Sequence, residues 1–174
     1  MPTLTKEALG EIVKHLAAER PRFCSEADFQ FALAWKIQQE FPQAEIRFEC
    51  PAVRGSESIK IDIIVNSDGE LVPIELKYKL KSQGRDTENR PDMLDDIDRL
   101  EVLRLDDLDL TRMNLAATPT NIKNRFVIWL SDNDRFWNEN SKNKILDYKE
   151  YVISWEAYVD DFQFALIDVL ESKR

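Results

Sequence analysis

The sequence is poor in the two residue types that serve most often as metal ligands and nucleophile partners, with one histidine and two cysteines in 174 residues. A single histidine, His15, excludes zinc centres with several histidines and nearly all Ser–His and Cys–His mechanisms. Cys24 and Cys50 form no CxxC pair. We therefore expect two free thiols in a reducing compartment, which points to the cytoplasm.

Long apolar runs are also missing. No stretch approaches the roughly 18 to 20 apolar residues that a membrane span needs, and the first segment, MPTLTKEALGEIVKHL, lacks the apolar run of a secretory signal. No helix-turn-helix or zinc-finger pattern occurs. With 43% hydrophobic residues the chain can bury a core, so we expect one globular domain over residues 1–174, away from membranes.

The most informative segment that is present is Ile59–Lys77, IKIDIIVNSDGELVPIELK. Its Asp68-Gly69 dipeptide is a strong signal for a two-residue hairpin turn, because a type I′ turn needs positive φ at both central positions. Direct pairing across that turn places Asp62 opposite Glu75. A longer loop with a bulge would shift the pairing.

Side chains alternate between the two faces of such a hairpin. One face is apolar and should be buried, with Ile59, Ile61, Ile63 and Val65 against Val72, Ile74, Leu76 and Tyr78. The other face carries Asp62 opposite Glu75 and Lys60 opposite Lys77. Like charges that face each other destabilise a sheet, so the two carboxylates need a cation. Either the two lysines or a divalent ion such as Mg²⁺ would meet this need.

A helix upstream supplies a further acid. Ser25 is a favourable N-cap, with Asp28 at the third helical position. The apolar residues that follow recur at helical spacing, and Glu26 lies near the centre of their stripe, with Gln30 one turn on. Acids in a first turn also complement the helix dipole, which accounts for Asp28 and partly for Glu26. We expect Glu26 to point inward.

Asp62, followed on the next strand by Glu75-Leu76-Lys77, with Glu26 on an upstream helix, resembles the PD-(D/E)XK nuclease superfamily. The resemblance covers roughly residues 25–131 and is to an uncharacterised bacterial member of this restriction-endonuclease-like group. Ile61 stands where the written motif has a proline. Such enzymes are magnesium-dependent hydrolases, so the resemblance implies an endonuclease, with DNA as the expected substrate.

The resemblance also implies residue roles. Asp62, Glu75 and the Leu76 carbonyl would bind Mg²⁺, for which Mn²⁺ would substitute, and Glu26 would bind a second ion or position water. Lys77 would orient the attacking water or take its proton. By the same resemblance Asp96 and Arg99, on a helix after the motif, would support the site, although ion pairs on the surface of one helix explain both residues as well. Gln30, on the same helix face as Glu26, would also support it.

Strand and helix patterns interleave along the rest of the chain, which favours an α/β domain with a central mixed sheet flanked by helices. Strands are expected at 45–50, 125–131 and 162–169, and a loop at 51–58. A polar segment at 82–89 looks mobile. Pro91 should open a helix to about residue 105, with Asp96 mostly facing solvent.

The net charge of −9 is unfavourable for a nucleic-acid enzyme, because Lys and Arg supply most of the affinity for phosphates. Residues 77–90 nevertheless carry an excess of cations. We expect phosphate contacts from Lys60, Lys79, Lys81 and Arg85, although a solvated loop explains the same charges.

Two other functions fit the sequence. One is a catalytically silent nuclease-like module for binding or assembly. The other is an acidic protein-interaction domain that mimics nucleic acid, suggested by the acids between 92 and 109. A homodimer or a partner protein would supply specificity, because the chain has no specificity domain of its own.

Overall fold

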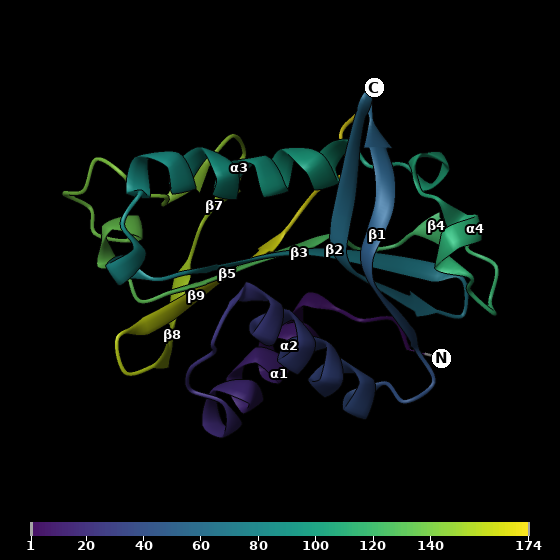
Figure 1. The fold of residues 1–174 in the computed structure, drawn as a ribbon, viewed down its shortest axis with the longest axis horizontal. Helices are drawn as coiled ribbons and strands as arrows, with labels where there is room; N and C mark the ends of the chain where they lie inside the picture. The colour runs from purple at the N-terminus through teal and green to yellow at the C-terminus, as the bar shows by residue number, and fades with distance from the viewer. Residues whose placement is uncertain (1, 174) are drawn as a thin grey trace.

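The computed structural model describes residues 2–173, which form a three-layered α/β domain (Figure 1). Helices α1 (Lys6–Glu19) and α2 (Glu26–Glu40) cover one face of a mixed sheet, and α3 (Asp86–Val102) covers the other. No helix within residues 2–173 is long and apolar enough to cross a membrane. The expected class, an α/β domain with a central mixed sheet and flanking helices, is confirmed.

The sheet has seven strands in the order β1-β2-β3-β5-β9-β8, with β4 also paired to β3. Strand β3 runs parallel to β4 and β5, and the other pairs are antiparallel. The strands are β1 (Glu45–Arg54), β2 (Glu57–Ser67), β3 (Glu70–Lys79), β4 (Asn121–Ile122), β5 (Phe126–Ser131), β8 (Trp155–Val159) and β9 (Phe162–Asp168).

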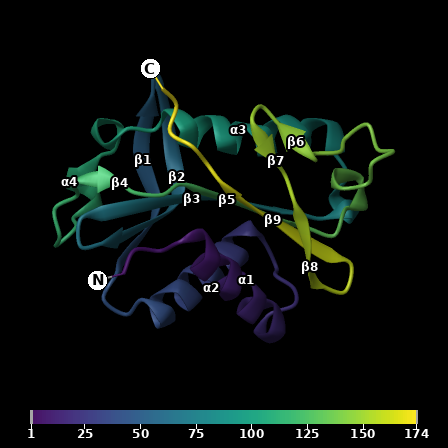
Figure 2. The same cartoon turned by 180° about the vertical axis from the view of Figure 1, so that it is seen from behind.

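Smaller elements surround this sheet. A two-stranded ribbon, β6 (Asp147–Tyr148) with β7 (Tyr151–Val152), lies beside α3 (Figure 2). Helix α4 spans Leu110–Met113, and three short 3₁₀ turns span Lys81–Gln83, Leu105–Asp107 and Asp134–Phe136.

Each face of the sheet has its own core. On the α1–α2 side the apolar stripe predicted for the helix after Ser25 is buried, including Leu33, and Leu9 of α1 is buried in the same core. On the α3 side Ile97 and Leu100 pack with Trp129 of β5. The expected strands at 125–131 and 162–169 are confirmed, and His15, in α1, is exposed.

The β2–β3 hairpin has the predicted turn. Asp68 and Gly69 both adopt positive φ, at 55° and 92°. The register is also as predicted from Ser67–Glu70 to Ile63–Ile74. The short-range turn signal therefore fixed the alignment of these two strands.

The expected loop at 51–58 is wrong. Strand β1 continues through Pro51 to Arg54, and Gly55-Ser56 alone form the turn into β2. Proline is tolerated there because β1 is an edge strand of the sheet, where the missing N–H breaks no central ladder.

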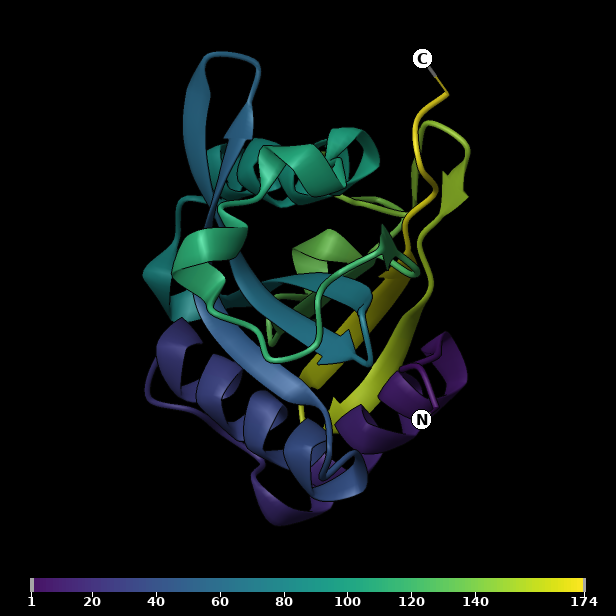
Figure 3. The same ribbon diagram turned by 90° about the vertical axis from the view of Figure 1, so that its right-hand side faces the viewer.

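The long β1–β2 hairpin projects past α3 (Figure 3). As a result Ile59 and Ile61 are buried, as expected, but in the core on the α3 side instead of with Ile63. The prediction of one continuous apolar face on this hairpin is therefore wrong, since it assumed a flat pair of strands.

Helix α3 begins at Asp86, five residues before Pro91, so the expected mobile segment at 82–89 is in fact a 3₁₀ turn and a first helical turn. Proline within the helix removes one backbone donor but does not end it. The expectation that Asp96 faces solvent is also wrong, because its side chain is buried.

Candidate functional site

The site is built where the sheet divides. Strands β2 and β3 stay paired only as far as Ile63–Ile74; beyond that β2 continues with β1, while β3 continues with β5. Asp62 and Glu75 are the next residues along the two strands. The predicted backbone pairing of these two residues, and of Lys60 with Lys77, is therefore not formed, because the strands separate there.

Side chains satisfy the backbone groups that the division frees. The Asp62 N–H donates to Glu75 Oε2 at 3.3 Å, and the Leu76 N–H donates to Asp62 Oδ2 at 2.8 Å. Gln30 Nε2 donates to the Asp62 carbonyl at 2.6 Å and to Glu49 Oε1 at 3.2 Å. Because buried backbone groups need partners, these bonds fix the two carboxylates in place.

The side chain of Glu26 extends from α2 to β3, close to these residues. Ser25 caps the helix by accepting from the Asp28 N–H, as predicted. Glu26 then points inward, and its Oε2 accepts from the Tyr78 N–H at 3.1 Å, directly after Lys77. Burial raises the pKa of Glu26, and the Lys77 charge works against that rise.

Lys77 is held by a buried acid. Its Nζ lies 2.7 Å from Asp96 Oδ1 and 3.3 Å from the Leu76 carbonyl oxygen. Asp96 is 1% exposed and also accepts from Trp129 Nε1 at 3.3 Å. Burial raises the pKa of Asp96 to about 7. Although burial alone lowers the pKa of Lys77, Asp96 raises it above its usual range, so the ammonium stays charged.

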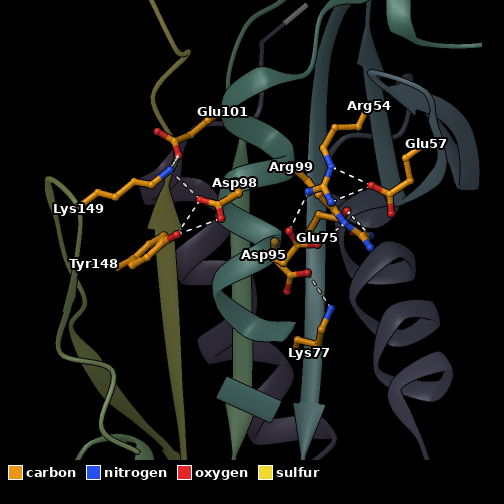
Figure 4. Close-up of polar contacts among 11 residues, drawn as sticks. Arg54, Glu57, Glu75, Lys77, Asp95, Asp98, Arg99, Glu101, Tyr148 and Lys149 are labelled. Atoms are coloured by element: carbon orange, nitrogen blue, oxygen red, sulfur yellow. Dashed lines mark hydrogen bonds and ion pairs between the residues drawn. The ribbon is translucent and has the colours of Figure 1, made fainter. Parts of the chain in front are cut away.

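Glu75 is a fully buried carboxylate of the site. It is 1% exposed, and burial, followed by the nearby charges of Asp62 and Asp96, raises its pKa well above the usual value. Its Oε1 has no hydrogen-bond partner, and Arg99 Nη1 lies 3.6 Å away (Figure 4). Such an oxygen is an exception among buried polar atoms and needs a cation or a proton.

These groups offer a partial set of metal ligands. Asp62 and Glu75 adjoin, and Glu26 and the Leu76 carbonyl lie beside Lys77. Within residues 2–173 no group of three or more His, Cys, Asp or Glu side chains is arranged to hold a metal ion. Since Mg²⁺ is typically held by one or two carboxylates together with several waters, Asp62 and Glu75 are the residues that could hold such an ion.

The predicted supporting residues all contact the site. Gln30 binds the Asp62 carbonyl, Asp96 pairs with Lys77, and Arg99 lies near Glu75. The sequence carried a signal for the burial of Asp96, because it lies three residues after Met93 and four before Leu100 on the apolar stripe of α3.

An open cleft of about 580 Å³ leads to Asp62 between the β1–β2 hairpin, α3 and α4. Its cationic lining is Lys60, Arg99 and Arg112. Of the expected phosphate contacts only Lys60 lies there. Lys79, Lys81 and Arg85 do not line it, since they follow β3 away from the division of the sheet, and Lys81 pairs with Asp134 at 3.2 Å.

Arg112 was missed by the sequence reasoning. It comes from α4, far along the chain, and no local pattern links that short helix to β2.

The acids of α3 are largely paired (Figure 4). Asp95 contacts Arg54 at 2.7 Å and Arg99 at 3.0 Å, and Asp98 contacts Lys149 at 2.7 Å. Together with the burial of Asp96, these pairs reduce the free acidic surface that a mimic of nucleic acid requires. The pairing of Arg54 with Asp95 was not predicted from the sequence, because surface charges carry no pattern that names their partners.

Comparisons of this chain with protein-family models, with curated proteins and with solved structures found no match. The fold and the site therefore define the class of this protein by structural features alone. It is an α/β domain in which a divided sheet presents two adjoining carboxylates, a helix-borne glutamate and a paired lysine.

Proposed function

We propose that this chain is a restriction-endonuclease-like, Mg²⁺-dependent nuclease that hydrolyses phosphodiester bonds, with DNA as the preferred substrate. The observation that carries the proposal is Glu75 Oε1, a buried carboxylate oxygen without a hydrogen bond, next to Asp62. A divalent cation would compensate this carboxylate pair more directly than Lys77, which is paired with Asp96, or Lys60, which is exposed.

In this proposal Asp62 and Glu75 hold Mg²⁺, Mn²⁺ substitutes for it, and Glu26 and the Leu76 carbonyl lie close enough to assist. When bound, the ion supplies Lewis acidity toward a phosphoryl oxygen and acidifies water. The chain itself contributes positioning. Gln30 holds the Asp62 backbone, and Asp96 holds the Lys77 ammonium beside Leu76.

Lys77 therefore acts as a fixed positive charge that orients water and stabilises negative charge on phosphate. Its contact with Asp96 at 2.7 Å argues against a role as a base, because the acid keeps the ammonium protonated. Arg99, near both Glu75 and the cleft, is placed to share this role.

The test is a cleavage assay on supercoiled, linear duplex and single-stranded DNA and on RNA, with Mg²⁺, Mn²⁺ or EDTA. We expect metal-dependent cleavage that falls by at least about 100-fold in Glu75→Gln, since a group that stabilises transition-state charge contributes on that scale. Lys77→Gln should lose activity similarly while keeping a donor for Asp96.

Glu11→Gln and Lys14→Ala, at exposed positions of α1, are matched controls and should cleave normally. Thermal unfolding of all variants separates loss of the site from loss of the fold. Undiminished cleavage by folded Glu75→Gln or Lys77→Gln would contradict the assignment.

A silent nuclease-like module is the second candidate, and one observation favours it. Lys77 and Arg99 already place positive charge beside the acids of the site, at 2.7 Å from Asp96 and 3.6 Å from Glu75. A module of this kind would bind nucleic acid or a partner protein with no cleavage in any metal, and with equal affinity in Glu75→Gln.

A further inference from the structure

Three exposed aromatic side chains lie together on the outer side of α2 and β1. Phe31 and Trp35 are each 59% exposed and Phe48 is 46% exposed. The rings of Phe31 and Trp35 are nearly parallel, with centroids 6.4 Å apart and an angle of 17° between their planes. We call these three residues the aromatic platform. Large apolar groups gathered on a surface in this way mark binding sites more often than single exposed residues do.

The aromatic platform borders a shallow groove between α2 and β1 of about 180 Å³, whose other lining residues are Ala34, Gln38 and Ile46. Phe31 and Trp35 remain largely exposed beside this groove, so their rings are accessible to a ligand.

The elements that carry the aromatic platform also contribute residues beside the candidate active site. Phe48 is followed in β1 by Glu49, which lines the cleft that leads to Asp62. Phe31 follows Gln30 in α2, and the Gln30 side chain joins Glu49 to the Asp62 carbonyl. A ligand chain could therefore extend from the cleft, past Asp62, onto the aromatic rings.

The cleft carries no excess of positive charge to attract phosphates. The cleft is lined by the cations Lys60, Arg99 and Arg112 and by the acids Glu49, Glu57 and Asp62, so it is balanced in a protein of net charge −9. Lys60 and Arg112 are exposed, and within residues 2–173 neither makes an ion pair. Two free cations allow a few phosphate contacts, so much of the affinity must come from another source.

We infer that the chain binds single-stranded nucleic acid, whose unpaired bases stack on the aromatic platform while its backbone passes Lys60 and Arg112 toward Asp62. This inference names the substrate class of the proposed nuclease. It rests on the proposed function in one respect, since the strand is taken to run toward Asp62 as the place of cleavage. In a duplex the base faces are covered by their neighbours, whereas each unpaired base offers a face to an aromatic ring.

The test is equilibrium binding in EDTA, so that cleavage plays no part. The probes are labelled oligo(dT) and oligo(U) of about 12 nucleotides, within the usual range of single-strand sites, and a duplex of equal length. We expect tighter binding of single strands than of duplex. Because stacking on one ring contributes about 1–3 kcal/mol, Trp35→Ala should weaken single-strand binding by about tenfold.

Trp35→Phe keeps an aromatic face and should restore most of the affinity. Val152→Ala, which shortens an 82%-exposed apolar side chain on β7, is the matched control and should bind normally. Comparison of oligo(dT) with oligo(U) tells DNA from RNA without bearing on the stacking itself.

The salt dependence separates stacking from charge. Each phosphate contact of a single strand adds about −0.7 to the slope of log affinity against log salt. Lys60→Ala and Arg112→Ala should each make the slope shallower by about that amount, whereas Trp35→Ala should lower the affinity and leave the slope unchanged.

Equal affinity of Trp35→Ala and the unmodified chain, or preference for the duplex, would overturn the inference. Self-association seen by sedimentation velocity and abolished in Trp35→Ala, with no binding of single strands, would overturn it as well, because the platform would then bind a second copy of the chain. Since binding is measured without metal, a protein that binds single strands but cleaves nothing would contradict the proposed function and not this inference.

Discussion

Asp96 lies in α3 at a position where a charged side chain has almost no access to water. It is 1% exposed and has two partners, the Lys77 ammonium and the Trp129 indole N–H. Removing one partner of a buried ion pair leaves the other charge without compensation. We therefore expect the contact between Asp96 and Lys77 to stabilise the folded site as well as to position Lys77.

We expect Asp96→Ala to lower the free energy of unfolding by about 3 kcal/mol, measured by denaturant titration, because it strands the Lys77 charge. Asp96→Asn should cost less, since its amide oxygen still accepts from Trp129. Asp92→Ala, at an exposed position of the same helix, should stay within about 0.5 kcal/mol. Equal stability of Asp96→Ala and Asp92→Ala would contradict the role given to the ion pair.

At the scale of elements, the β2–β3 hairpin depends on its turn. Gly69 has φ of +92°, and a Cβ atom there would lie 2.7 Å from the Thr118 carbonyl oxygen. Gly55, in the β1–β2 turn, has φ of +62° but no atom within 4 Å of such a Cβ. The two glycines thus share a backbone conformation that would be strained for any residue with a Cβ atom, and they differ in the space around them.

We expect Gly69→Ala to destabilise the domain clearly more than Gly55→Ala does. Both substitutions incur a backbone penalty of about 1 kcal/mol, and Gly69→Ala adds a clash with backbone that no side-chain rotation relieves. Thermal unfolding of the two variants measures the difference. Similar melting temperatures would contradict this prediction, because they would mean that the backbone at Thr118 moves to accommodate the added methyl group.

Local signals predicted the elements that local chemistry determines. The Asp68-Gly69 turn gave the hairpin register, Ser25 gave the start of α2, and helical spacing placed Glu26 inward. These features depend on a few adjacent residues, so the sequence was sufficient for them.

The errors arose where distant parts of the chain decide. Pro51 was taken as the start of a loop and Pro91 as the start of a helix, yet β1 continues through Pro51 at a sheet edge and α3 begins five residues before Pro91. The division of the sheet at Asp62 was not predicted, because it depends on β5, which pairs with β3 from fifty residues downstream. The register set by the turn does not indicate where β2 and β3 separate.

For the whole molecule, the net charge of −9 does not describe the surface that a ligand meets. Acids of α3 are paired with Arg54, Arg99 and Lys149, and the cleft at Asp62 is balanced in charge. The net charge therefore does not exclude the proposed binding of nucleic acid, which would rely on a few phosphate contacts and on stacking.

The central claim is that Asp62 and Glu75 share a divalent cation, and a calorimetric titration with Mn²⁺ tests it most directly. We predict binding by the unmodified chain that is lost in Asp62→Asn and in Glu75→Gln, and retained in the exposed control Glu11→Gln, because only the first two remove a ligand charge. No binding by the unmodified chain, or equal binding by all four proteins, would contradict the claim.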